Sequence, residues 1–180
     1  DDNDASDIDR IWSTDPDHGG NDNITTGDGN DIIIGGEDGE NVVDTVVGIA
    51  GDIERTVERT LDIDGNYIDG DIIDAGQGNN IVFGDNGQIT AAATNDENFF
   101  GLPITLGLVE TIESLIGGSD TITTGVGRDI ILGGIDGDTI VANFDEYQDD
   151  EWIANGANDG ARYGSDQNNI IIGDSGYIDW

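Results

Sequence analysis

Residues 17–43 read DHGGNDNIT, TGDGNDIII and GGEDGENVV, three consecutive nine-residue units with one pattern. The pattern is G-G-x-G-x-D-x-U-x, in which U is a large aliphatic residue. It returns at residues 115–141 as LIGGSDTIT, TGVGRDIIL and GGIDGDTIV. Glycine accepts positive φ and lets the backbone approach an ion closely, and an acidic side chain supplies hard oxygen ligands. The repeat therefore predicts very short strands with inward aliphatic residues, separated by tight acidic turns.

This pattern resembles the nonapeptide repeats of RTX proteins, the hemolysin-type calcium-binding family. The resemblance implies an all-β fold, a right-handed parallel β-roll or β-solenoid in which two nonapeptides make one coil. Because a single coil cannot bury its aliphatic face alone, stability would come from the stacking of neighbouring coils. The resemblance also implies several Ca²⁺ ions bound in the turns.

The acidic residues of neighbouring turns are expected to share these ions. Calcium takes six to eight oxygen ligands, so one Asp per turn cannot complete its shell. Turns on the same edge of the solenoid are two nonapeptides apart. This spacing pairs Asp22 with the acids of residues 38–40, and Asp120 with the acids of residues 136–138.

A second set of acids lies on the opposite edge. Asp31 and Asp129 need partners from other coils, either the turn of Asp71 or the turn of Asn80. Asn80 and Asn169 place a neutral amide at the sixth position, so their turns are expected to be weak sites or no sites. The GDNG and GDSG turns that follow still contain an Asp each. The candidate metal ligands are Asp22, Asp31, Asp38, Glu40, Asp71, Asp85, Asp120, Asp129, Asp136, Asp138 and Asp174.

The charge of the chain supports bound cations. It carries 40 acidic and 5 basic residues, a formal net charge of -35, and repulsion at this density opposes compaction. An acidic disordered segment would have a similar composition, but it would not place Ile24, Ile33 and Val42 at a strict spacing of nine. The sign of the charge argues against nucleic acid as a partner, and no apolar stretch is long enough to insert into a membrane.

A larger repeat is visible above the nonapeptides. The triplet at 17–43 recurs 98 positions later, and NNIVFGDNGQI at 79–89 recurs 89 positions later as NNIIIGDSGYI. We therefore interpret residues 1–180 as one solenoid domain made of two unequal super-repeats, about 13–112 and 113–180.

The segments between the repeats are less regular. Ile53, Val57 and Leu61 have a spacing that predicts a short amphipathic helix over 51–61. The segment 99–109 is apolar and is expected to cover a sheet face or to form an interface strand. Such a cover is needed because the central strands are apolar on both sides. The outward residues of that stripe are Ile32, Ile34, Ile81, Phe83, Ile130, Leu132, Ile170 and Ile172.

Nothing in the sequence indicates catalysis. The chain has no Cys and no Lys nucleophile, and its one histidine, His18, occupies a turn position of the repeat. We expect a calcium-binding structural repeat of a secreted or cell-surface protein of bacterial type, an adhesin extender or an extracellular fibre building block. Placing Ser13 after Trp180 would continue the pattern, so neighbouring repeats or copies of the chain are expected end to end. The alternative is a secretion and folding module of an RTX toxin or enzyme whose activity lies elsewhere; an ice-binding solenoid is disfavoured because its Thr array is too short.

Overall fold

The computed structural model describes residues 8–16, 18–38, 41–45, 54–58, 60–61, 67–68, 70–93, 99, 102, 104–142 and 168–180. All regular elements among these residues are β-strands. The described residues contain no helix, and hence none long and apolar enough to cross a membrane. This confirms the all-β class.

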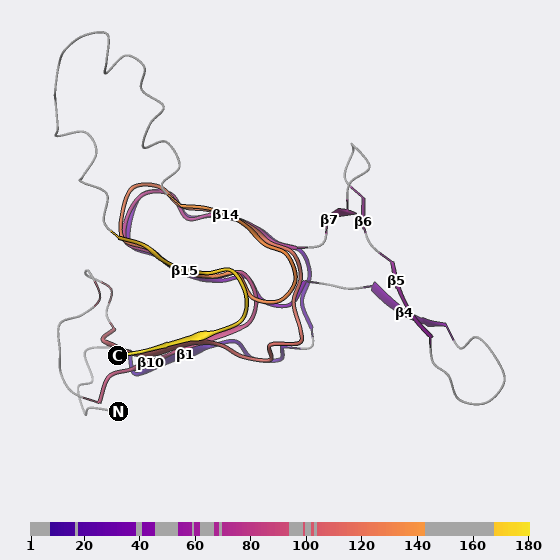
Figure 1. The fold of residues 1–180 in the computed structure, drawn as a ribbon, viewed down its shortest axis with the longest axis horizontal. Coiled ribbons are helices and arrows are strands. Elements are labelled where there is room, and N and C mark those ends of the chain that lie inside the picture. Colours follow the sequence, from indigo (N-terminus) through magenta and orange to yellow (C-terminus); the bar gives the residue numbers. More distant parts are fainter. Residues whose placement is uncertain are drawn as a thin grey trace, which may run out of the picture.

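Two parallel sheets form the stacked part of the molecule (Figure 1). The first has the order β14-β12-β8-β2, with β2 Asn23–Thr25, β8 Ile72–Asp74, β12 Thr121–Thr123 and β14 Thr139–Val141. The second has the order β15-β13-β9-β3, with β3 Ile32–Ile34, β9 Ile81–Phe83, β13 Ile130–Leu132 and β15 Ile170–Ile172. Each coil contributes one strand to each sheet, which confirms the predicted parallel solenoid. We number the coils 1 to 4: β2–β3, β8–β9, β12–β13 and β14–β15.

The first three coils repeat every 49 residues. Ile24 is aligned with Ile73, and Ile73 with Ile122, each 49 positions further along the chain. Gly35 and Gly36 still donate backbone hydrogen bonds to Phe83 O and Gly84 O of coil 2. The strand of this third nonapeptide, however, does not join the stack that the repeat predicts. Residues 41–45 form β4 (Asn41–Thr45), which pairs antiparallel with β5 (Glu54–Glu58) in a hairpin outside the stack, and β8 takes the expected place beside β2.

The predicted helix over 51–61 is also wrong. Residues 54–58 form β5, and β6 (Thr60–Leu61) pairs antiparallel with β7 (Tyr67–Ile68). A spacing of four residues fits one face of a helix, but it is also a multiple of the two-residue period of a strand. The β-branched residues Thr56 and Val57 favour the strand.

A third, antiparallel sheet covers the outer face of the second parallel sheet. Its order is β1-β10-β11-β16, with β1 Arg10–Trp12, β10 Gly87–Ala91, β11 Leu106–Thr111 and β16 Tyr177–Asp179. The predicted cover from segment 99–109 is thereby confirmed, since β11 belongs to this sheet and Leu102 and Ile104 pack beneath it. Ile81, Phe83 and Leu132 are fully buried there, and each such residue contributes roughly 1.5–3 kcal/mol to stability.

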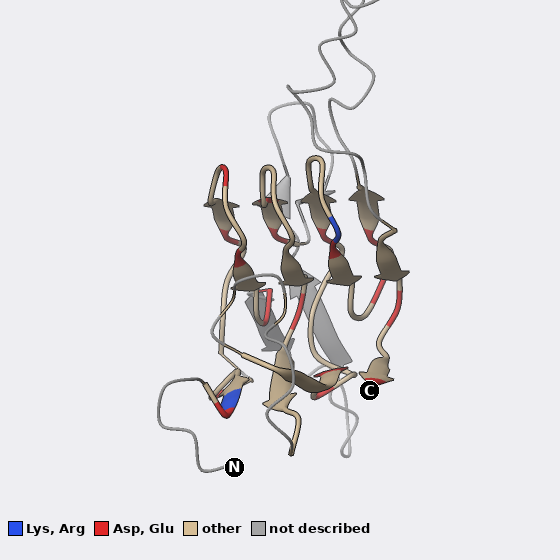
Figure 2. Ribbon diagram, turned by 90° about the vertical axis from the view of Figure 1, so that its left-hand side faces the viewer, with Lys and Arg blue, Asp and Glu red and all other residues tan. Residues whose placement is uncertain are grey.

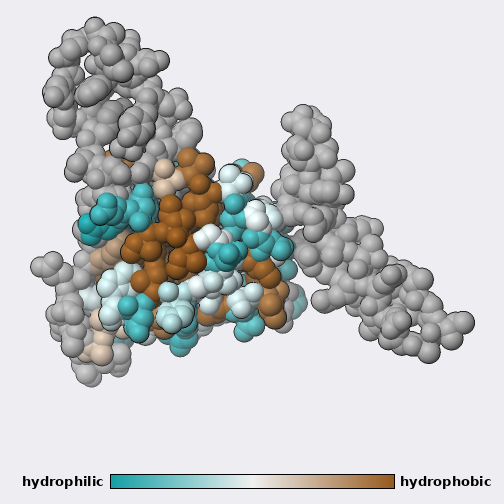
Figure 3. Space-filling view, in the orientation of Figure 1, coloured by the Kyte–Doolittle hydropathy of each residue, from teal (hydrophilic) through white to brown (hydrophobic). Residues whose placement is uncertain are grey.

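The molecule thus has two apolar layers. One lies between the parallel sheets and contains Ile73, Val82, Ile122 and Ile131. The other lies between the second parallel sheet and the antiparallel sheet. Figure 3 views both layers from one end of the stack, where apolar atoms reach the surface.

The turn after the second strand of each coil differs according to the sheet that the chain enters next. After β3 and β13 the sequence is GG, and Gly36 and Gly134 have φ of 113° and 122°. That left-handed conformation, which suits glycine, turns the chain back towards the first parallel sheet. After β9 and β15 the second residue is Asp85 or Asp174, neither of which has positive φ, and the chain continues into the antiparallel sheet.

Candidate metal centre

Four aspartates form a column along one edge of the solenoid, which we call the acidic ladder. They are Asp22, Asp71, Asp120 and Asp138, one from each coil, directly before the strands of the first parallel sheet. In each step the backbone N–H of one aspartate donates to Oδ1 of the aspartate in the next coil, at 2.7, 2.7 and 2.9 Å. The red turn segments in Figure 2 mark this arrangement. Because this hydrogen bond engages Oδ1, it fixes the direction of the other carboxylate oxygen, Oδ2, in Asp71, Asp120 and Asp138.

That second oxygen has no hydrogen-bond partner in three of the four residues. Oδ2 of Asp71, of Asp120 and of Asp138 is buried and without a donor. An unpaired buried carboxylate oxygen is costly. These oxygens are therefore available to a cation.

Each of these oxygens lies against a glycine turn. A Cβ placed on Gly35 would lie 2.1 Å from Asp71 Oδ2 and 2.0 Å from the carbonyl oxygen of Gly84. The same combination repeats one coil further on, where a Cβ on Gly84 would lie 1.9 Å from Asp120 Oδ2 and 2.4 Å from Gly133 O. The third copy consists of Gly133, Asp138 Oδ2 and Gly173 O. We call these three arrangements cradles; each offers a carboxylate and a carbonyl oxygen, the donor set that Ca²⁺ prefers.

Two further buried aspartates lie beside the ladder. Asp38 is 4% exposed, and neither of its carboxylate oxygens has a hydrogen-bond partner. One carboxylate oxygen each of Asp38, Asp71 and Asp120 lie within 4.8 Å of one another. Asp85 is 2% exposed and accepts the backbone N–H of Gly118 at 3.0 Å and of Ile135 at 2.5 Å. Several carboxylates are thus confined to one dry edge, a distribution that needs cations.

Burial and the nearby negative charges raise the pKa values of these aspartates. Burial raises the pKa of Asp38 to about 10, and the charges of Asp120 and Asp71 add to the effect. Burial also raises the pKa of Asp71, that of Asp120 to about 8 and that of Asp85 to about 7, partly opposed by backbone donors. The pKa of Asp138 is raised to about 6, again mainly by burial. Without a cation, Asp38 and Asp120 would retain protons near neutral pH.

The opposite edge has a column of the same geometry and different chemistry, which we call the mixed ladder. It alternates Asp31, Asn80, Asp129 and Asn169, with backbone N–H to Oδ1 distances of 3.1, 2.9 and 2.8 Å. Here the second side-chain atom is partly satisfied, since Asn80 Nδ2 donates to Gly78 O at 3.4 Å and Thr124 Oγ1 donates to Asp129 Oδ2 at 2.8 Å. Of the two partners that the sequence left open for Asp31 and Asp129, the turn of Asp71 or the turn of Asn80, the structure shows that of Asn80.

The structure changes one predicted pairing and keeps another. The backbone N–H of Asp22 donates to Asp71 and not to Asp38, whose carboxylate instead lies beside those of Asp71 and Asp120. The pairing of Asp120 with Asp138 is confirmed. The other candidates are Asp136 and Asp174, which are exposed and lie close enough to raise the pKa of Asp138, and Glu40, which lies outside the described residues.

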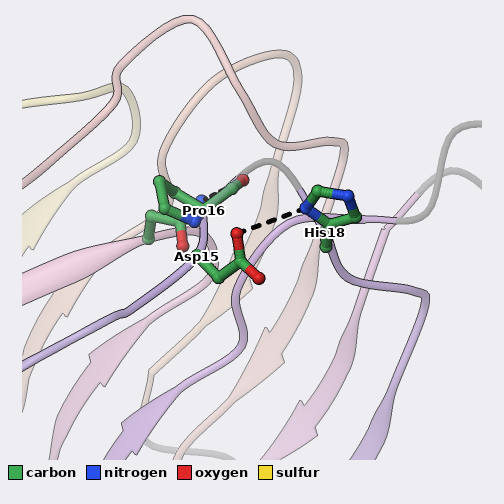
Figure 4. A network of polar contacts seen from close by, with 4 residues as sticks. Asp15, Pro16 and His18 are labelled. Carbon is green, nitrogen blue, oxygen red and sulfur yellow. Dashed lines mark hydrogen bonds and ion pairs between the residues drawn. The ribbon is translucent and has the colours of Figure 1, made fainter.

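His18 lies in a turn, as predicted. Its backbone N–H donates to Asp15 O at 3.1 Å, and its imidazole Nδ1 lies 3.3 Å from Asp15 Oδ1 (Figure 4). Both side chains are 78% exposed. The contact accounts for the histidine as a surface turn residue, and the absence of enzymatic activity stays a prediction.

Comparison with known families supports this geometry. The model of the RTX calcium-binding nonapeptide repeat matches four copies, over residues 18–39, 68–88 and 117–145. The chain carries RTX repeats. Neither the curated proteins nor the solved structures gave a match. The matched RTX segments contain all four members of the acidic ladder, and RTX repeats bind calcium in general.

Sequence reasoning identified the aspartates but not how Asp38 meets Asp71 and Asp120. The available signal was the 49-residue period, in which Asp22, Asp71 and Asp120 hold one position. The nonapeptide period obscured it, because residues 41–43 complete the short pattern but pair in a hairpin outside the stack.

Proposed function

We propose that this chain is a calcium-dependent structural repeat of a secreted or cell-surface protein, an adhesin extender or an extracellular fibre building block. The observation that supports it best is the acidic ladder, whose Oδ2 atoms are buried, unpartnered and set against glycine carbonyls in three successive cradles. Each cradle joins two coils, so a cation there would hold the stack together against a net charge of -35. The residues present fit calcium through hard oxygens in a flexible geometry.

A load-bearing extracellular role is further supported by the shape of the molecule. The stack has a third sheet that widens it and buries a second apolar layer. RTX proteins are typically secreted, which agrees with an extracellular location. A secretion module would need the coils alone, whereas the added antiparallel sheet favours a structural element.

The test is a calcium titration of the purified chain followed by far-UV circular dichroism. Binding to a site that exists only in the folded state stabilises it by RT ln(1 + [L]/Kd) per site. We expect little β-structure in chelator and a cooperative gain with millimolar calcium. Magnesium should substitute poorly because it demands octahedral geometry and retains its waters. A chain that is fully folded in chelator would contradict the proposal.

Pulling single molecules by force spectroscopy tests the mechanical part. The unfolding force should fall sharply when calcium is withdrawn. An unfolding force that is low and equal in calcium and chelator would argue against an extender or fibre role, while leaving calcium binding intact. Immunolabelling of intact producing cells tests the surface location.

A further inference from the structure

The two ends of the stack expose the two halves of an interface that the molecule already contains. Among the described residues, β1, β2 and β3 are the outermost strands of the three sheets at one end, and β16, β14 and β15 are outermost at the other. In the middle of the molecule, strands β8, β9 and β10 pair with β12, β13 and β11. Coils 1 and 3 therefore follow the same chain path, and so do coils 2 and 4.

The end that carries coil 4 exposes apolar side chains that are buried in the coil below it. Ile170 is 39% exposed and Ile171 is 48% exposed, whereas Ile130 and Ile131 at the aligned positions are 1% and 0% exposed. Val141 of β14 is 43% exposed. Figure 3 shows the resulting apolar patch over β14 and β15.

The same end contains an incomplete cradle. The glycines at the three complete positions each meet the next coil's glycine carbonyl and Asp Oδ2. Gly173 occupies the fourth position, but a Cβ placed on it would meet no atom within 4 Å. The atoms missing there are the ones that a coil of type 1 carries, Gly35 O and Asp22 Oδ2.

The strand directions allow the stack to continue without a break. The antiparallel sheet has four alternating strands, so β1 of a second molecule would lie antiparallel to β16. The parallel sheets would continue with β2 beside β14 and β3 beside β15. Asp22 would extend the acidic ladder beyond Asp138, and Asp31 would preserve the Asp–Asn alternation of the mixed ladder.

We propose that a second copy of this chain stacks head to tail on the first, with its β1, β2 and β3 pairing to β16, β14 and β15. The junction reproduces the internal contact between coils 2 and 3, covers Ile170 and Ile171, and completes the cradle at Gly173. Only this last element rests on the proposed calcium role. Because the interface is heterologous, the assembly grows as a filament.

Backbone donors at each end indicate variants that block one junction and spare the fold. Ile72 N donates to Asp22 O and Thr26 N donates to Asp74 O, so by alternation the Thr25 N–H points away from β8. Ile170 N donates to Asp129 O, so the Ile171 N–H points away from β13. Thr25→Pro removes an outward backbone N–H from β2, and Ile171→Pro removes one from β15. Each change weakens the pairing of one outer strand with a second molecule.

The experiment measures assembly by sedimentation velocity of the full chain in millimolar calcium, with circular dichroism to verify folding. The wild-type chain should form multimers that lengthen with concentration. Each proline variant alone should be monomeric, and an equal mixture should form dimers and nothing longer, because only one junction remains. The control is Ile72→Asp, which replaces a 47% exposed strand residue in the middle of the stack and should assemble like the wild type.

A disulfide test covers the case in which a proline variant does not fold. The chain has no cysteine, so a Val141→Cys, Thr25→Cys double variant reports on the proposed register alone. Oxidation should give a ladder of covalent multimers, while Val141→Cys paired with Ile72→Cys should give none. A folded, calcium-loaded wild-type chain that stays monomeric at all concentrations, or a symmetric dimer that survives both proline changes, would overturn the stacking proposal and leave the calcium-dependent fold untouched.

Discussion

The acidic and mixed ladders share one backbone geometry and differ in a single chemical choice. Both pass a backbone N–H to Oδ1 of the next coil at about the same distance. In the acidic ladder the remaining atom is always a carboxylate oxygen, and three of the four are buried without a donor. In the mixed ladder every second residue is an amide, which halves the charge and supplies its own donor.

This comparison shows that the backbone N–H to Oδ1 hydrogen bonds hold neighbouring coils together in both ladders. Whether a ladder depends on cations is set by the remaining carboxylate oxygen, Oδ2. An amide oxygen satisfies the N–H as well as a carboxylate oxygen does. The acidic ladder is left with three buried carboxylate oxygens that have no donor, whereas the mixed ladder is left with one, Oδ2 of Asp31. We therefore expect calcium dependence to reside mainly on the edge of the acidic ladder.

Removal of calcium should have the largest effect. Chelation leaves the acidic ladder, Asp38 and Asp85 without counter-charge, so the chain should lose its cooperative β-structure. Circular dichroism and thermal melting measure this loss, and sodium or potassium at equal ionic strength serves as the control. Recovery with monovalent salt alone would mean that general screening, not coordination in the cradles, is sufficient.

Acid should partly replace calcium. In the folded, ion-free chain the pKa of Asp38, Asp120 and Asp85 lies near 10, 8 and 7, well above the ordinary value of 3.8. A raised pKa gives stability that is present below the ordinary value and is lost as pH rises through the folded value, at roughly 1.4 kcal/mol per pKa unit. In chelator, urea midpoints should therefore be higher at pH 5 than at pH 8. The order should reverse in excess calcium, since ions replace protons, and a chelated chain that gains stability with rising pH would contradict the pKa shifts.

Matched amide substitutions on coil 3 compare the ladders directly. Asp120 and Asp129 are 1% and 0% exposed, and both accept the ladder hydrogen bond through Oδ1. Asp120→Asn should raise the calcium midpoint of folding about tenfold or more, about 1.4 kcal/mol, because it removes a cradle oxygen. Asp129→Asn should shift it much less, since Asn80 and Asn169 already hold that position in neighbouring coils. Equal shifts in calcium titrations would show that bulk charge matters and position does not.

Converting one amide of the mixed ladder to an acid should give the smallest effect. Asn80→Asp would place three successive carboxylates in the mixed ladder, with Asp31 and Asp129 on either side. In limiting calcium this variant should lower stability by about 1 kcal/mol, because a buried charge lacks a partner. High calcium should restore part of that loss. Asn80→Ser, which is neutral, is the control that separates charge from the loss of the side-chain hydrogen bond, and thermal melts at two calcium concentrations distinguish the two.

Much of this architecture was predictable from local patterns. Three-residue aliphatic segments between glycine turns predict short parallel strands, because the aliphatic residues recur at one position of every turn. The outward apolar residues Ile81, Phe83, Ile130 and Leu132 predicted a cover, and segment 99–109 was identified correctly as part of it. The alignment of the candidate ligands was also predictable, since an Asp at a fixed turn position must recur along one edge; their role as calcium ligands stays a prediction.

The errors came from segments whose local pattern fits two outcomes. Residues 35–43 match the nonapeptide, and residues 51–61 match a helical spacing, yet residues 41–45 and 54–58 pair with each other. A strand of the stack pairs where the whole coil, with both its strands and its turns, matches the neighbouring coil. The matching residues of coils 1, 2 and 3 are 49 positions apart in the sequence. No nine-residue window contains this information.

The short strands, the acidic turns and the apolar stripe follow from residue chemistry repeated at a fixed interval, so local sequence was sufficient to predict them. The tertiary structure alone decided which turns meet. It placed Asp38 beside Asp71 and Asp120, separated the acidic edge from the mixed edge, and used Asp85 in place of a second glycine to send the chain into a third sheet. These outcomes depend on contacts between residues 18 or more positions apart, and such contacts form only when whole coils stack.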